Sequence, residues 1–212
     1  MENERKKNKF SCFGKRERGF VNPIRAAKRW CTNVKYACQR IRYGYCERDM
    51  ESMDLWFLNV VPNMLSDLRA NTQGFPTEIA KKVGYDLQNP DEEKEQAAKK
   101  EWDSVLEEMI HYLREANEDT CQKKNPYEEQ YDAAWQEFNE KYNNGEKLKS
   151  AEEKAEEKKN GLSHMHFPKE LPEYKGVVEK FMEEEKVLES YRDECKDKGL
   201  QLFGKWFWSL WD

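Results

Sequence analysis

Apolar residues recur three and four positions apart along most of this 212-residue chain, and no stretch alternates convincingly between apolar and polar positions. This spacing gathers apolar side chains on one face of an α-helix, whereas alternation would indicate a β-strand. We therefore expect an all-α fold, an irregular bundle of about five to seven helices. The strongest helical period lies at Trp102, Val105, Leu106, Met109, Ile110 and Leu113.

The first predicted helix is both amphipathic and basic. Asn22 is a good N-cap, Pro23 suits the first helical position, and Gly44 is a natural stop. The apolar stripe consists of Ile24, Ala27, Cys31, Val34, Cys38 and Ile41. Cations fill the neighbouring arc, and those expected to contact phosphate or nucleic acid are Arg25, Lys28, Arg29 and Lys35.

A second helix is expected to start near Arg48-Asp49. Pro62 lies inside it, which predicts a kink or a break at Val61. Residues 71–76 predict a turn. The apolar stripe of this second helix is Met50, Met53, Phe57, Val61, Met64 and Leu68.

Two later helices are expected to begin at Asn-Pro pairs, with the asparagine as N-cap. These pairs are Asn89-Pro90 and Asn125-Pro126, and the second precedes an aromatic stripe. Residues 141–160 are rich in Lys, Glu and Asn and predict either a solvated helix extension or a disordered insert. Gly199 is expected to break the C-terminal helix in two.

Charge divides the chain, because residues 1–48 are strongly basic although the formal net charge is -5. This asymmetry favours an anionic partner for the basic end, or attraction between the two parts. We expect a basic flexible tail over 1–21 and a helical core over 22–117. An aromatic helix and the charged insert would occupy 118–168, and C-terminal helices that pack on the core would occupy 169–212.

The sequence lacks the signatures of several classes of protein. No run approaches the roughly 18 apolar residues that span a bilayer, and the start lacks the apolar region of a signal peptide, so we expect a cytoplasmic protein without a membrane partner. The cysteines show no CxxC spacing and predict free thiols. Glu108 and His111 have the ExxH spacing of di-iron bundles, but no second such pair occurs. Phosphate-binding glycine loops and catalytic-serine motifs are also missing, which favours a non-enzymatic protein without a cofactor or metal.

The stretch from Arg40 to Trp56 concentrates the candidate ligand-binding residues. Asp54 falls among the apolar positions of the second predicted helix, where a carboxylate is costly unless it is paired. A structural salt bridge with Arg40, Arg42 or Arg48 would satisfy it, and so would an anion-binding or catalytic cluster; with a different helical phase, Asp54 would instead be exposed. Interleaved aromatic rings offer stacking surfaces for bases. The full candidate set is Arg40, Arg42, Tyr43, Tyr45, Arg48, Asp49, Asp54 and Trp56.

The C-terminal segment is aromatic, with Phe203, Phe207, Leu210 and Trp211 on one side of a predicted helix. It either closes the core or presents an exposed aromatic anchor for a partner or an oligomer.

Several of these segments together resemble a widespread group of bacteriophage and prophage proteins to which no activity is assigned. In that group a basic helix leads into an Arg-Gly-aromatic segment, an Arg-Asp stretch, a Gly-aromatic-Pro turn and a Glu-Trp-Asp helix, and the chain often ends in an LWD-like segment. The resemblance covers about half of the chain and implies a viral source and a compact helical fold. The matching positions are Arg42, Gly44, Tyr45, Arg48, Asp49, Asp54, Trp56, Gly74, Phe75, Pro76, Glu101, Trp102, Asp103, Leu210, Trp211 and Asp212.

Three hypotheses about function follow. The first is a phage-encoded, non-enzymatic binding protein in the host cytoplasm, whose anionic ligand is a nucleotide, a nucleotide-derived defence signal or nucleic acid. The second is a virion component, or a protein that contacts a host or phage protein or a second copy of itself. The third is a metal-dependent phosphodiesterase or nuclease that uses Asp49 and Asp54.

Overall fold

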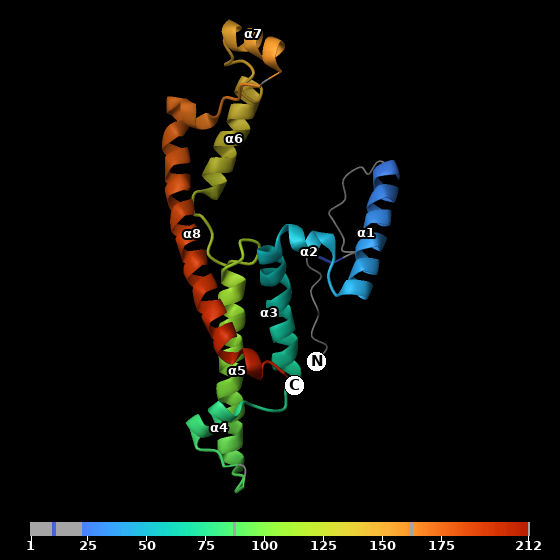
Figure 1. Cartoon of the computed structure of the whole chain (residues 1–212). Helices are drawn as coiled ribbons and strands as arrows, with labels where there is room; N and C mark the ends of the chain where they lie inside the picture. The colour runs from blue at the N-terminus through green and yellow to red at the C-terminus, as the bar shows by residue number, and fades with distance from the viewer. Residues whose placement is uncertain (1–9, 12–22, 87, 162, 212) are drawn as a thin grey trace. The chain divides into compact units, whose positions relative to one another are not determined.

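The computed structural model describes residues 10–11, 23–86, 88–161 and 163–211 (Figure 1). Within these ranges the regular elements are helices and no strand occurs, which confirms the all-α expectation. The expected tail over 1–21, apart from Phe10 and Ser11, and the expected cap Asn22 lie outside the described residues, as does Asp212. The helices are α1 (Pro23–Tyr43), α2 (Glu47–Glu51), α3 (Met53–Asn71), α4 (Thr77–Val83), α5 (Glu92–Glu115), α6 (Glu128–Tyr142), α7 (Ala151–Asn160) and α8 (Pro172–Trp206), with short 3-10 turns at Pro168–Glu170 and Phe207–Ser209.

The chain divides into two compact units. The first consists of residues 1–121 and 193–212, and the second of residues 122–192. Helix α8 contributes residues to both units. The segments expected from the sequence, 118–168 and 169–212, therefore have other boundaries than these units.

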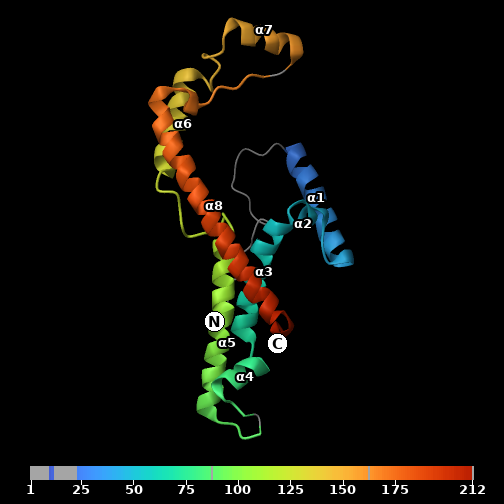
Figure 2. The same ribbon diagram turned by 60° about the vertical axis from the view of Figure 1, so that its left-hand side comes forward.

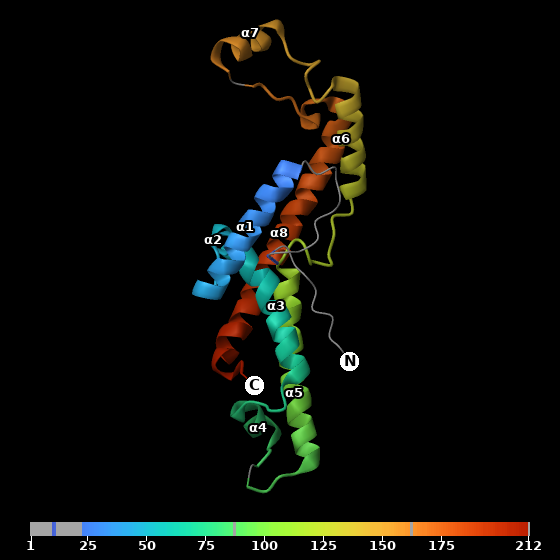
Figure 3. The ribbon, with the colours of Figure 1, turned by 90° about the vertical axis from the view of Figure 1, so that its right-hand side faces the viewer.

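The core of the first unit forms where α3 and α4 pack against α5 (Figure 1, Figure 3). The expected stripe of α5 faces this core, and Leu106, Met109 and Leu113 are completely buried. Trp102 meets Trp206 with ring centroids 5.3 Å apart. Each fully buried apolar side chain contributes about 1.5–3 kcal/mol, so this stripe accounts for much of what holds the unit together.

Helix α8 runs unbroken through Gly199, so the expected break there is wrong. Gly199 is buried, and a Cβ added to it would lie 2.9 Å from Cδ2 of Leu113 and 3.3 Å from the Leu113 backbone nitrogen. The missing side chain lets α8 approach α5 closely. Tertiary packing thus explains a residue that disfavours a helix locally.

The second predicted helix is in fact two helices, because the chain leaves helical geometry at Ser52 (φ −147°, ψ 71°). Only part of the expected apolar stripe faces the core. Val61, Pro62 and Leu65 are buried, whereas several members of the expected stripe are exposed: Met50, Met53 and Met64.

The buried position expected for Asp54 is wrong. Asp54 lies in the first turn of α3 and is exposed. Its helical phase is right, because the buried Val61 and Leu65 follow seven and eleven residues later on the same side of α3, but the core contacts of this helix begin only at Phe57. The buried carboxylate of this region is Asp49, which is 5% exposed and belongs to α2.

Pro62 lies within α3 without ending it, so of the kink or break expected at Val61 the break does not occur. Proline has no N–H, and the carbonyl oxygen of Leu58, four residues earlier, therefore loses its helical donor. The side-chain amide of Asn117, just after α5, donates to that oxygen at 3.4 Å. Asn117 is buried, and this contact supplies the hydrogen bond that proline removes.

The start of α5 also differs from expectation. Asp91, rather than Asn89, is the N-cap, and its Oδ1 accepts the backbone N–H groups of Glu93 and Lys94 at 3.0 and 3.4 Å. Two residues that both suit an N-cap lie close together here, and local propensity alone does not choose between them.

In the second unit, α6 meets the first part of α8 through aromatic side chains (Figure 2). Tyr131 stacks on Phe181 with ring centroids 3.9 Å apart, and the buried Phe138 meets Tyr174 edge-on. Asn125 does not cap α6, which begins at Glu128. Its buried side chain instead donates to the Phe181 carbonyl oxygen at 3.0 Å, which ties the loop before α6 to α8.

The charged segment that the sequence left open is the helix α7. Ser150 caps it: its Oγ accepts the Glu153 N–H at 3.1 Å, and the Glu153 carboxylate accepts the Ser150 N–H at 2.7 Å. Lys149 makes ion pairs with Glu146 and Glu157 at 2.6 and 2.7 Å. Local capping and charge pairing therefore hold a helix that buries none of its residues.

The described cysteines are free thiols, as expected: Cys46, Cys121 and Cys195 are buried, while Cys31 and Cys38 are exposed. In the described part of the chain, no helix has the length and apolar character needed to cross a membrane.

Candidate functional site

Helix α1 exposes both of its faces. None of its residues is buried, and among the described helices it contacts only α2 (Figure 1). It contains no acidic residue, so its charge is entirely positive. Gly44 ends it with a positive φ of 80°, and its N–H donates to the Arg40 carbonyl oxygen at 2.9 Å. The chain then turns into α2.

A buried ion pair closes this corner between α1 and α2. Arg40 donates from Nη2 to Oδ1 of Asp49 at 2.5 Å and from Nε to Oδ2 at 3.1 Å. The Cys46 N–H donates to Oδ2 at 2.9 Å. Burial acts to raise the pKa of Asp49, but the hydrogen bonds from Arg40 and Cys46 outweigh it and hold that pKa below its ordinary value. Asp49 is therefore a charged, fully engaged carboxylate.

A second set of contacts reinforces the corner. Lys35 pairs with Glu47 at 2.7 Å, and this pairing raises the pKa of Lys35. Gln39 donates to the Glu47 carboxylate at 2.9 Å and accepts the Glu47 N–H at 3.1 Å. Arg40 and Lys35 thus hold α2 against α1, which makes their contacts structural.

The remaining cations of α1 are exposed and make no ion pair with any described residue. They are spread along the whole helix, and the distance from Arg25 to Arg42 is about 25 Å at the rise of an α-helix. These cations are Arg25, Lys28, Arg29 and Arg42.

Aromatic rings accompany the cations at the end of α1. The guanidinium of Arg42 lies 5.4 Å from the ring centroid of Tyr43. Tyr43 and Tyr45 are 57% and 51% exposed, so each presents an accessible ring face. Arg48 lies over the ring of Phe10 at 5.4 Å.

The structure brings together only some of the residues selected from the sequence. Arg40 and Asp49 are in direct contact, and Tyr43 and Tyr45 lie beside them in the chain. Trp56 is half-buried in α3, and Asp54 is exposed in the same helix, so these two residues belong to a different element. The pairing role that the sequence analysis assigned to Asp54 is filled by Asp49.

One signal in the sequence does point to Asp49. It stands three residues after Cys46, at position N3 of α2, where a carboxylate can accept the N–H of the N-cap residue. This spacing is easily missed, because the N-cap residue is a cysteine rather than serine or threonine.

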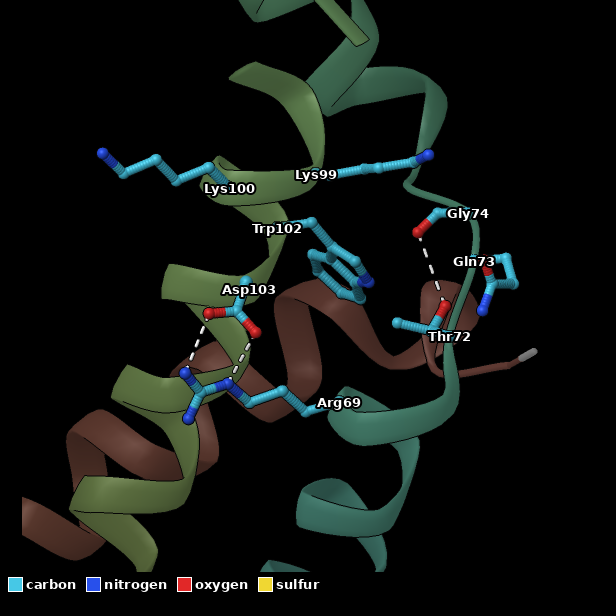
Figure 4. A pocket seen from close by; sticks show the side chains of 8 residues that line it. All are labelled: Arg69, Thr72, Gln73, Gly74, Lys99, Lys100, Trp102 and Asp103. Carbon is cyan, nitrogen blue, oxygen red and sulfur yellow. Dashed lines mark hydrogen bonds and ion pairs between the residues drawn. The ribbon is translucent and has the colours of Figure 1, made fainter. Parts of the chain in front are cut away.

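A second site, which is concave and which the sequence did not predict, lies where the end of α3 faces α5 (Figure 4). Its volume is about 310 Å³. Arg69 donates to both carboxylate oxygens of Asp103 at 2.6 and 2.8 Å, and the hydrogen bonds from Arg69 lower the pKa of Asp103. Lys99 pairs with Glu95 at 2.6 Å. The charges of this wall are thus largely neutralised within the protein.

The described residues form no cluster of His, Cys, Asp and Glu side chains suited to a metal ion. Both oxygens of Asp49 already accept hydrogen bonds, and Asp54 lies on another helix. This arrangement gives no support to the metal-dependent hydrolase hypothesis.

No family model matches the chain, and neither the curated proteins nor the solved structures contain a match to it. The resemblance to phage and prophage proteins therefore stays a prediction.

Proposed function

We propose that this protein is a non-enzymatic nucleic-acid-binding protein that contacts the phosphate backbone through the polar face of α1. The observation that carries this proposal is a helix with no buried residue, with exposed cations near both of its ends and no acidic residue. Phosphate contacts by Lys and Arg supply most of the affinity of sequence-independent binding.

The arrangement of the cations supports a polymer rather than a single nucleotide. A mononucleotide is held in a concave site by converging groups. The unpaired cations of α1 lie instead on a convex surface over about 25 Å, a span that suits successive phosphates. Tyr43 and Tyr45 add exposed rings at one end, on which bases of a single strand would stack.

Arg40 and Asp49 have a positioning role in this proposal. Their ion pair holds α2 against the end of α1, and with it the turn that carries Tyr43 and Tyr45. The predicted resemblance to phage proteins adds a biological setting, the cytoplasm of an infected bacterium. The alternative ligand is a nucleotide-derived defence signal. If the protein sequestered such a signal, it would bind one small molecule per chain instead of a nucleic acid.

The proposal is tested with the double substitution Arg25→Ala/Arg29→Ala and fluorescein-labelled single- and double-stranded oligonucleotides. Binding is measured by fluorescence anisotropy at several salt concentrations. For duplex DNA the slope of log K against log salt is about −0.9 for each phosphate contact, so the slope should become shallower by about two. The matched control is Lys180→Ala/Lys186→Ala, which removes the same charge from exposed positions of α8.

Three results would contradict the proposal. The first is that the wild-type chain binds no oligonucleotide at low salt. The second is that the control substitutions weaken binding as much as Arg25→Ala/Arg29→Ala do. The third is the stoichiometric release of a mononucleotide or cyclic oligonucleotide from purified protein on heating. This result would show that the ligand is a small molecule and not a nucleic acid.

A further inference from the structure

The apolar residues of α1 are spaced more regularly than an amphipathic helix requires. Its stripe alternates intervals of three and four without exception across three heptads, at Ile24, Ala27, Cys31, Val34, Cys38 and Ile41. This average spacing of 3.5 residues is the period of a coiled-coil seam, in which Ile24, Cys31 and Cys38 occupy position a and the other three position d.

The structure leaves most of this seam exposed, and Val34 is half-buried. Ile41 is 87% exposed, Cys31 and Cys38 are exposed, and Trp30 beside them is 63% exposed. Within the described part of the chain, α2 is the sole helix that α1 contacts, and it does so through the polar side chains of the corner. A contiguous apolar face of this kind marks an interaction surface.

The side chains along the seam favour another helix as the occupant. The central positions Cys31, Val34 and Cys38 are small, and small seam residues let two helix backbones approach closely. Helices that lie in a lipid surface instead rely on large apolar residues such as Leu, Phe and Trp. Trp30 is the one large aromatic of this face, and it lies at the border of the seam rather than in it.

Charge decides which helix fits. Lys28, Lys35 and Arg42 are spaced seven residues apart and all occupy heptad position e, directly beside the seam. Side chains at e and g set the choice of partner in coiled coils. A second copy of α1 would bring no acidic residue to these cations, since the helix contains none. An acidic helix would pair with Lys28 and Arg42, while Glu47 of α2 already pairs with Lys35 at 2.7 Å within the chain.

We propose that α1 docks an acidic amphipathic helix of a partner protein as a short heterodimeric coiled coil. The partner presents apolar residues to the seam and carboxylates to Lys28 and Arg42. This surface shares Lys28 and Arg42 with the phosphate-binding one, whereas Arg25 and Arg29, at heptad positions b and f on the opposite side of α1, belong to the phosphate-binding surface alone.

The probe is a labelled three-heptad peptide with Ile at position a, Leu at d and Glu at e and g; a peptide with Lys at e and g is its control. We expect the full-length chain to bind the acidic peptide and not the basic one. Ile41→Asp should weaken binding by about 10- to 100-fold, because it removes one buried seam residue. Ile41 is exposed in the free chain, so this change should not unfold it. Thr32→Asp, which places the same charge on the opposite face, is the matched control and should have little effect.

A charge reversal gives the sharper test. Lys28→Glu/Arg42→Glu should exchange the preference, so that the basic peptide binds and the acidic one does not. Loss of folding would instead abolish the binding of both peptides. Arg25→Ala/Arg29→Ala should leave peptide binding unchanged, which separates this proposal from nucleic-acid binding. The proposal is overturned if the acidic peptide does not bind, or if Ile41→Asp binds it as well as wild type. It is also overturned if the free chain sediments as a dimer that Ile41→Asp disrupts, or if vesicles with anionic lipid take up the chain through the same residue.

Discussion

Substitution of Gly199 by alanine tests whether the contact between α8 and α5 explains this glycine. In a solvent-exposed helix, alanine is more favourable than glycine by about 0.5–1 kcal/mol. At this position the new Cβ would lie 2.9 Å from Cδ2, 3.1 Å from Cγ and 3.3 Å from the backbone nitrogen of Leu113. Leu113 is completely buried, so neither its side chain nor its backbone has room to withdraw.

Overpacking of this kind costs about 1–3 kcal/mol, which exceeds the gain in helix propensity. We expect Gly199→Ala to lower the free energy of unfolding by about 1–2 kcal/mol. With a urea m value of about 1–3 kcal/mol per molar, the midpoint of urea unfolding should fall by roughly 0.5–1 M. Far-ultraviolet circular dichroism follows the transition, with Trp fluorescence as a second probe.

Gly204→Ala is the matched control, because it lies in the same helix and the same unit with nothing within 4 Å of the added Cβ. It should stabilise the unit by about 0.5 kcal/mol. If Gly199→Ala raises the urea midpoint as Gly204→Ala does, the close approach of α5 and α8 is not real and the glycine has no packing role.

Two further predictions concern the corner between α1 and α2. Arg40→Ala leaves the buried carboxylate of Asp49 with Cys46 alone as a donor, through its N–H and its thiol. We expect a cost of about 1–3 kcal/mol and faster proteolysis near residue 44, whereas Arg42→Ala, an exposed change, should alter neither. Because the folded-state pKa of Asp49 is depressed, its contribution to stability is present above the ordinary pKa of an aspartate and is lost as the pH falls through the lower folded-state value. Asp49→Asn should therefore flatten the acid limb of a stability-against-pH profile, and an unchanged acid limb would exclude this carboxylate as its source.

The phase of a helix can be calculated from sequence only while the helix is continuous. Asp49 shows this, because it lies before the interruption at Ser52 and belongs to a separate helix, whereas Asp54 is in phase with the buried Val61 and is exposed because it stands in the first turn of α3. Ser52 looks unremarkable as a helix breaker, since serine is only slightly unfavourable within helices. The ion pair that closes the corner thus involves a different carboxylate from the one the wheel selected.

The sequence by itself determined where most helices lie, which face of α5 is buried, and that α1 is basic on one side and apolar on the other. These properties follow from side chains three and four residues apart and are therefore local. Only the tertiary structure decided that Gly199 continues a helix and that the Leu58 carbonyl left by Pro62 receives a donor from Asn117. It alone also decided that the apolar face of α1 stays exposed. Each of these outcomes depends on which distant residue lies opposite, and spacing along one helix carries no information about its neighbour.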